Sequence, residues 1–132
     1  MHFVVESGRY EVRAFADVRE NFAHEIPAMA FLQDKLSQKQ YAGSARGFKG
    51  LFVRYSDKGK KGLTVEMFHE VDSPNEIWEF VKGDLRIFCF RDEGHIVLTH
   101  GCIKKSQKVD QQEITIAVSA KKKYFESNGK QL

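Results

Sequence analysis

The stretch that most constrains the fold covers residues 77–108 and reads IWEFVKGDLRIFCFRDEGHIVLTHGCIKKSQK. It contains three short apolar runs, Ile77–Val81, Leu85–Arg91 and His95–Ile103, separated by KGD and DEG. Each separator holds a glycine, which supplies the positive φ that a tight turn needs. Three such runs joined by tight turns predict an antiparallel meander with at least one buried face.

The segments on either side of the meander add a strand and helices. Residues Tyr10–Phe15 alternate polar and apolar side chains, which indicates a strand. Residues 24–36 are predicted to form a helix, with Pro27 in its first turn. Residues 111–127 are predicted to form a closing helix, with Asp110 as its N-cap.

A second helix is expected over residues 37–59, with Ser37 as its N-cap, and residues 63–71 are expected to be extended. Together the segments predict one α+β domain over residues 1–132. Its expected core is a small antiparallel sheet with two N-terminal helices on one face and a C-terminal helix. Apolar side chains recur at helical spacing in the second helix, namely Tyr41, Ala45, Phe48, Phe52 and Tyr55.

The composition is that of a soluble globular protein, and we expect it in the cytoplasm. It is 42% hydrophobic and 30% charged, and no apolar run approaches the ~18 residues that a membrane span needs. The N-terminus lacks a basic segment followed by a long apolar one, so no signal peptide is expected. Cys89 and Cys102 lie inside predicted strands without zinc-like spacing. We therefore expect two reduced thiols, no metal and no cofactor.

Positive charge is concentrated in two segments. The formal net charge of +3 permits a polyanionic partner without requiring one. Residues 46–61 carry six basic residues against Asp57, and residues 104–123 carry six lysines against Asp110 and Glu113. The first segment is either a solvated helix face or a surface for RNA or for a partner protein.

The meander ends in lysines, and polar residues stand within its strands. Arg86 and His100 occupy strand positions where a polar side chain lies at an edge or on a face left open for a ligand. A strand histidine can equally be a hydrogen-bonded structural residue. A three-residue turn at DEG would place Arg86 opposite His100, and a two-residue turn would place it opposite Gly101. The resulting cationic face can bind an RNA backbone. It comprises Arg86, His100, Lys104, Lys105 and Lys108.

Three segments match patterns of a known toxin family. The pattern lWElr corresponds to Ile77–Phe80, and lRifyfrd corresponds to Leu85–Asp92. The pattern ivLlHgF.KKtqktp..Ei..A corresponds to Ile96–Lys108 followed by Glu113, Ile114 and Ala117. Through these segments, residues 10–125 resemble the RelE/HigB/ParE superfamily of bacterial toxins, and within it the phage-derived HigB-like branch.

The resemblance implies a RelE-like fold and the toxin of a type II toxin–antitoxin system, acting as a ribosome-dependent mRNA endoribonuclease. In such toxins the 2′-hydroxyl of the mRNA attacks the adjacent phosphate and leaves a 2′,3′-cyclic phosphate, without a metal ion. By carry-over, Arg86 would stabilise the phosphate together with Lys104 or Lys105. His100 would act as an acid or base. The residues expected to bind the RNA backbone are Lys82, Arg91 and Lys108.

The resemblance also implies partners. These are a cognate antitoxin, expected to be a small helix-turn-helix protein, and mRNA on the ribosome, with no membrane involved. Two alternatives stay open. The ParE-like branch shares the fold but poisons DNA gyrase without nuclease activity, and the lysine pair with Arg86 favours RNA cleavage over it. A non-catalytic binding module that retains the fold is the second alternative.

Overall fold

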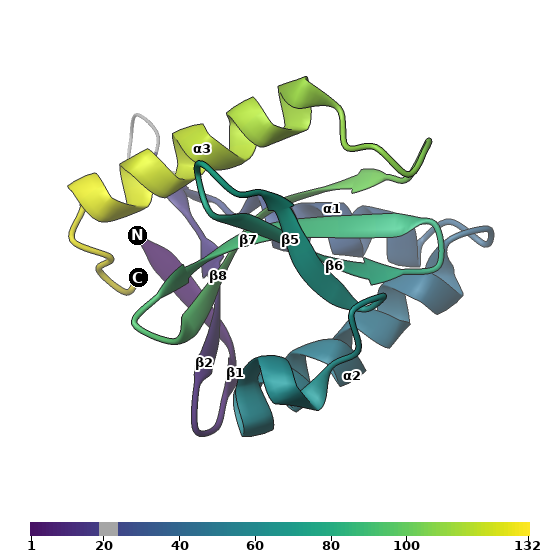
Figure 1. The fold of residues 1–132 in the computed structure, drawn as a ribbon, viewed down its shortest axis with the longest axis horizontal. Helices are drawn as coiled ribbons and strands as arrows, with labels where there is room; N and C mark the ends of the chain where they lie inside the picture. The colour runs from purple at the N-terminus through teal and green to yellow at the C-terminus, as the bar shows by residue number, and fades with distance from the viewer. Residues whose placement is uncertain (19–23) are drawn as a thin grey trace.

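The structure is a computed structural model that describes residues 1–18 and 24–132. Within these residues, three helices and a six-stranded sheet make an α+β fold (Figure 1). In chain order the elements are β1 (His2–Ser7), β2 (Glu11–Phe15), β3 (Asp17–Val18), β4 (His24–Glu25), α1 (Pro27–Leu36), α2 (Ala42–Lys58), a 3-10 turn η2 (Gly59–Gly62), β5 (Phe68–Asp72), β6 (Ile77–Lys82), β7 (Leu85–Asp92), β8 (His95–Ile103) and α3 (Gln111–Glu126).

The six strands form a mixed sheet in the order β1-β2-β8-β7-β6-β5. The predicted meander is confirmed over β6, β7 and β8, which pair antiparallel. The expectation of a purely antiparallel sheet is wrong, because β2 and β8 run parallel, with Val12 opposite Ile96. A parallel pair needs a long crossover, and here helices α1 and α2 and the five strands β3 to β7 separate β2 from β8. Strand β1, which the sequence reasoning missed, extends the sheet beyond β2.

The hairpin between β7 and β8 determines where Arg86 lies. Its turn has two residues, both with positive φ, 50° at Glu93 and 88° at Gly94. A register shift after Ile87 then moves the pairing by one residue, so Arg86 lies opposite Cys102. Neither register that the sequence allowed is correct. The shift left no trace in the sequence, because apolar side chains fill both faces of this strand.

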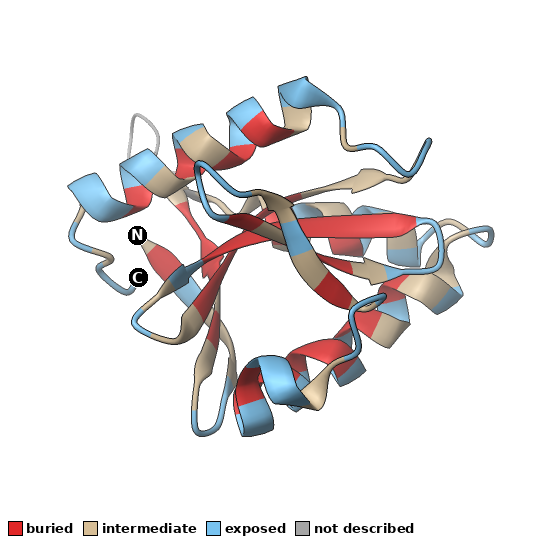
Figure 2. Ribbon diagram, viewed as in Figure 1, coloured by how far each residue is buried: buried red, intermediate tan, exposed pale blue. Residues whose placement is uncertain are grey.

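Apolar side chains form one core on each face of the sheet. Strand β7 contributes to both cores, which explains its unbroken apolar run: Ile87 packs toward α1 and α2, whereas Phe88 packs toward α3. Helices α1 and α2 therefore cover one face and α3 covers the opposite face (Figure 1). Colouring by burial shows β7 as buried along most of its length, between these two layers (Figure 2).

Two local expectations are corrected. Ser37 does not cap α2; it follows α1, and its hydroxyl donates to the Asp34 carbonyl oxygen at 2.6 Å. Helix α2 begins after Tyr41 without a side-chain cap. Residues 63–71 are only partly extended, because turns occupy the segment before β5, where Met67 N–H donates to the Thr64 carbonyl oxygen. The predicted apolar stripe of α2 is confirmed, with Ala45, Phe48, Phe52 and Tyr55 buried.

The closing helix begins as predicted. The Asp110 side chain accepts a hydrogen bond from Gln112 N–H at 3.0 Å, which satisfies one of the free donors in the first turn of α3. Both cysteines are free and lie in strands, Cys89 buried in β7 and Cys102 half-buried in β8. Burial raises the pKa of the Cys102 thiol to about 11, so it is a poor nucleophile near neutral pH.

None of the helices described in residues 1–18 and 24–132 is both long enough and apolar enough to cross a membrane.

Candidate functional site

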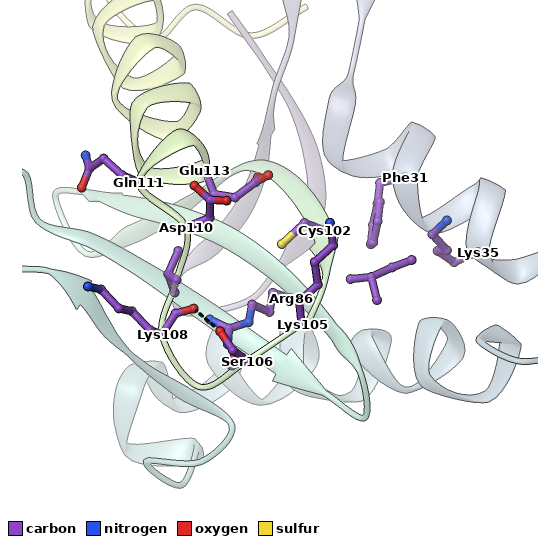
Figure 3. A pocket seen from close by; sticks show the side chains of 12 residues that line it. Phe31, Lys35, Arg86, Cys102, Lys105, Ser106, Lys108, Asp110, Gln111 and Glu113 are labelled. Carbon is purple, nitrogen blue, oxygen red and sulfur yellow. Dashed lines mark hydrogen bonds between the residues drawn. The ribbon is translucent and has the colours of Figure 1, made fainter.

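A pocket of about 650 Å³ opens where β8 ends and α3 begins (Figure 3). We call it the basic pocket. Its walls come from α1, β7, the end of β8 and the first turn of α3. The linker between β8 and α3, residues 104–110, completes them, and we call it the basic linker. Cationic side chains outnumber acidic ones around it, so it suits an anion. The cations are Lys35, Arg86, Lys105 and Lys108, and the acids are Asp110 and Glu113.

The structure brings together part of the predicted set. Arg86, Lys105 and Lys108 all line the basic pocket. Lys104 is adjacent in sequence but is not part of the pocket wall, and its N–H donates to the Asp84 carbonyl oxygen. His100 belongs to a second, smaller pocket between α1 and α3. The fold thus separates His100 from the lysines that the sequence placed with it.

The two remaining predicted RNA contacts lie away from the basic pocket. The Arg91 guanidinium stacks 4.5 Å from the centre of the Trp78 ring, and the Lys60 ammonium lies 5.0 Å from the same ring. Lys82 is exposed at the end of β6, where its stem lies against Gly47 of α2. These cations pack against Trp78 and α2, and none of them lines the basic pocket.

Arg86 is buried, and the expectation that it lies on an open sheet face is wrong. Its side chain is 3% exposed, and Nη1 donates to Glu79 Oε1 at 3.1 Å. Its Nη2 donates to the backbone carbonyl oxygens of Ser106 and Gln107 in the basic linker. A guanidinium presents donors in a fixed planar fork, and here that fork joins a buried carboxylate to the linker. Arg86 therefore fixes the segment that carries Lys105 and Lys108.

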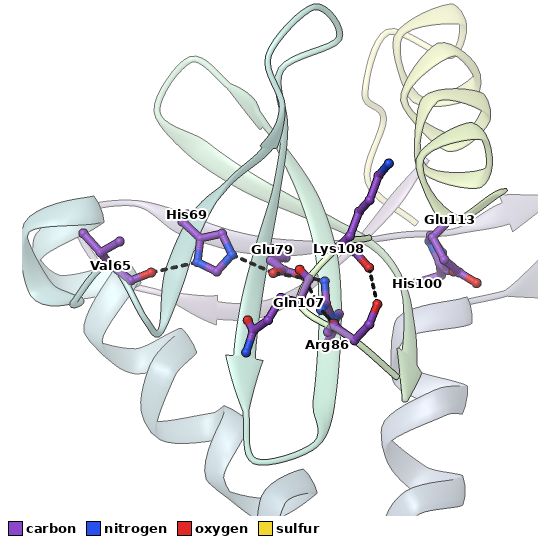
Figure 4. A network of polar contacts seen from close by, with 9 residues as sticks. Val65, His69, Glu79, Arg86, His100, Gln107, Lys108 and Glu113 are labelled. Carbon is purple, nitrogen blue, oxygen red and sulfur yellow. Dashed lines mark hydrogen bonds and ion pairs between the residues drawn. The ribbon is translucent and has the colours of Figure 1, made fainter. Parts of the chain in front are cut away.

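The pair extends into a chain of polar contacts across the sheet (Figure 4). Glu79 Oε2 lies 2.7 Å from His69 Nε2, and His69 Nδ1 lies 2.7 Å from the Val65 carbonyl oxygen. The network links β5, β6, β7 and the basic linker. The sequence reasoning missed it. The available signal was a pair of opposite charges, Glu79 and Arg86, at otherwise apolar positions of adjacent strands, where diagonal neighbours on one face come within reach.

His100 makes hydrogen bonds through both ring nitrogens. Its Nδ1 lies 3.0 Å from Thr99 Oγ1, and its Nε2 lies 2.7 Å from Glu113 Oε2. Burial lowers the pKa of His100 below its usual 6.5, although the hydrogen bond with Glu113 opposes this. The Thr99 hydroxyl also lies 3.3 Å from the Phe88 carbonyl oxygen, so its one proton serves either that oxygen or Nδ1 of a neutral ring that donates from Nε2 to Glu113. Of this pair, Glu113 is the member that lines the basic pocket.

The two pocket-lining lysines of the linker are available to a ligand. Lys105 and Lys108 are exposed, and neither has an ion-pair partner within the described part of the chain. Lys35 of α1 approaches from the opposite wall, with its ammonium 3.0 Å from Asp34 and 5.4 Å from the Phe31 ring centre. The sequence did not identify Lys35, because only tertiary packing brings α1 to the end of β8.

No group of three or more His, Cys, Asp or Glu side chains in residues 1–18 and 24–132 is arranged to hold a metal ion.

The fold and site define an α+β protein with a cationic pocket at the end of a sheet. The chain belongs to the family of phage-derived Gp49-like proteins, whose family model matches residues 33–122. The match takes in α2, β5 to β8, the basic linker and α3 as far as residue 122, and so nearly all of the basic pocket. No curated protein matches the chain.

Proposed function

We propose that the protein is the toxin of a toxin–antitoxin system and that it cleaves mRNA on the ribosome. The observation that carries the proposal is the basic pocket, a concavity large enough for a nucleotide phosphate and its sugar. Lys105 and Lys108 are among its lining residues, and neither has an ion-pair partner within residues 1–18 and 24–132. Two further points support it. The Gp49-like family is associated with the toxins of such systems. The segments that resemble the HigB-like branch form β6, β7, β8 and the basic linker.

In this proposal the pocket acts by positioning and electrostatics. Lys105 and Lys108 bind the scissile phosphate and stabilise the extra negative charge that develops as the 2′-hydroxyl attacks. Arg86 holds the carbonyl groups of Ser106 and Gln107, so the backbone that carries the two lysines need not be ordered during the reaction. Its charge, compensated by Glu79, is used for this and not for a direct phosphate contact.

The alternatives make different demands on the molecule. A gyrase inhibitor acts by binding a protein, which does not require a concave cationic pocket. A non-catalytic module could use the same pocket to bind RNA without cutting it. The test must therefore measure cleavage and gyrase inhibition side by side.

The experiment adds the purified protein to ribosomes translating a defined mRNA and maps cuts by primer extension. We expect cuts within the translated region, absent without ribosomes, and upstream fragments that end in a 2′,3′-cyclic phosphate. A parallel assay follows supercoiling by DNA gyrase. Blocked supercoiling without mRNA cleavage would replace the proposal with gyrase inhibition. Inactivity in both assays would favour the non-catalytic module.

A further inference from the structure

Glu113 presents a carboxylate oxygen to the basic pocket. It lies in the first turn of α3, and its side chain is 24% exposed, against 11% for that of His100. Oε2 accepts from His100 Nε2 at 2.7 Å, whereas Oε1 accepts no hydrogen bond from any residue in the described part of the chain. The contact with His100 restricts the orientation of the carboxylate. Figure 3 shows Glu113 at the pocket rim contributed by α3, and Figure 4 shows it beside His100.

We propose that Glu113 is the general base of the cleavage reaction and that His100 is the residue that positions it. The inference rests on the proposed function. Glu113 Oε1 takes the proton of the 2′-hydroxyl while O2′ attacks the phosphorus, so a P–O2′ bond forms and the P–O5′ bond breaks. The leaving O5′ takes a proton from water. The hydroxide that remains is neutralised by the proton that Glu113 gives up, which restores the carboxylate.

The other carboxylates near the pocket are committed elsewhere. Asp110 caps α3 through its contact with Gln112 N–H. Glu79 is 3% exposed and is held between Arg86 and His69. Glu79 therefore lacks pocket exposure. Asp110 shares pocket exposure with Glu113 and uses only Oδ1 in its cap, but of the two only Glu113 has its carboxylate oriented by another side chain, His100.

His100 is the competing candidate, and its geometry argues against direct proton transfer. Its two nitrogens are occupied by Thr99 and Glu113, and it does not line the basic pocket. A catalytic base must reach the proton that it removes. The imidazole contacts Glu113, which lines the pocket, but does not line the pocket itself. It can therefore act on the substrate only through the Glu113 carboxylate.

The deciding variant is Glu113→Gln. An amide oxygen still accepts from His100 Nε2, so the link between β8 and α3 is retained, but an amide cannot take up a proton at working pH. Loss of a general base slows reactions by about 10²–10⁴-fold, so we expect cleavage at least ~100-fold slower with little change in binding to programmed ribosomes. Glu126→Gln, which removes an exposed carboxylate from the last turn of the same helix, is the matched control and should match wild type.

The pH profile separates a base from a structural residue. The wild-type single-turnover rate should fall toward acid as the base becomes protonated, and Glu113→Gln should lose this fall. His100→Gln should slow the reaction less than Glu113→Gln does. Its rate should still decrease toward acid pH, because the Glu113 carboxylate remains. Other charged or titratable groups around Glu113 can also influence the pH profiles. They are His100, Lys35, Arg86, Cys102, Lys105, Lys108 and Asp110.

Single-turnover cleavage on ribosomes programmed with a defined mRNA, measured across pH for folded variants, tests the inference. Glu113→Asp keeps the carboxylate one methylene further back. Its cleavage rate should lie between those of wild type and Glu113→Gln, and it should still decrease toward acid pH. This variant decides the question if Glu113→Gln does not fold. Cleavage by Glu113→Gln at the wild-type rate, or equal rates for the Asp and Gln variants, would overturn it. A wild type that cuts no mRNA would overturn the proposed function and this inference with it.

Discussion

Arg86 and Glu79 form a buried ion pair, with Nη1 3.1 Å from Oε1 and each side chain 3% exposed. The same guanidinium donates to two carbonyl groups of the basic linker, so the pair connects the centre of the sheet to the edge of the basic pocket. Burying two charges is costly, and a pair of this kind is retained only where its geometry and extra hydrogen bonds offset that cost. Here the extra bonds position a lysine-bearing segment.

Breaking the pair should cost stability. Glu79→Gln leaves Arg86 charged and buried without its counterion, and such changes cost about 3–5 kcal/mol of unfolding free energy. Urea denaturation measures it. Glu66→Gln, at an exposed position of a turn before β5, is the control and should stay within about 0.5 kcal/mol of wild type. The double variant Glu79→Leu/Arg86→Met should recover much of the loss. Equal stabilities for Glu79→Gln and Glu66→Gln would contradict the assignment.

Replacing Arg86 by lysine should loosen the basic linker even though the charge is kept. A single ammonium cannot reach Glu79 and two carbonyl groups with the geometry of a guanidinium fork. Amide hydrogen exchange over residues 104–110 should therefore become faster in Arg86→Lys, while exchange in β6 changes little. Lys121→Arg on α3 is the control, because it exchanges the same two side-chain types away from the basic linker and should leave exchange in residues 104–110 unchanged. Unchanged exchange in the linker would show that Arg86 does not hold it.

Stability should depend on pH through His100. Burial holds the pKa of His100 below the ordinary value of 6.5, so as pH falls through 6.5 the unfolded chain binds a proton that the folded chain does not. The unfolding free energy then decreases, by at most about 1.4 kcal/mol per pH unit for one group, until pH reaches the folded pKa. His100→Gln should lose part of this decrease between pH 7.5 and 5.5. Burial also lowers the pKa of His2, so some pH dependence should remain. An unchanged pH dependence in His100→Gln would contradict the prediction.

The sequence predicted the parts of the fold that depend on local pattern. The strands at Ile77, Leu85 and His95 followed from apolar runs and turn glycines, and Asp110 from cap chemistry. Strand β1 and the parallel contact of β2 with β8 were not predicted, because the choice of strand neighbours is decided by packing between distant segments. The same holds for the register of Arg86, which a shift within an apolar run displaced.

The sequence predicted which residues meet at the candidate site better than it predicted how they are arranged. Arg86, Lys105 and Lys108 do meet at one pocket, as expected from their closeness in the meander. Their roles differ, because burial and the Glu79 carboxylate, neither visible in a charge count, take up the donors of Arg86. Lys35 was not predicted, because it joins the basic pocket only through the packing of α1 on β8.

The central claim is that Lys105 and Lys108 of the basic pocket bind and cut mRNA. Its most direct test is the single-turnover cleavage rate of mRNA on programmed ribosomes for Lys105→Ala and Lys108→Ala. Losing a charged contact to the transition state costs several kcal/mol, so each should cut ~100-fold or more slowly. Lys104→Ala is the matched control, since it removes the same charge from the neighbouring position outside the pocket wall, and it should stay within about tenfold of wild type. Wild-type rates for folded Lys105→Ala and Lys108→Ala, or a loss in Lys104→Ala as large as theirs, would contradict the account.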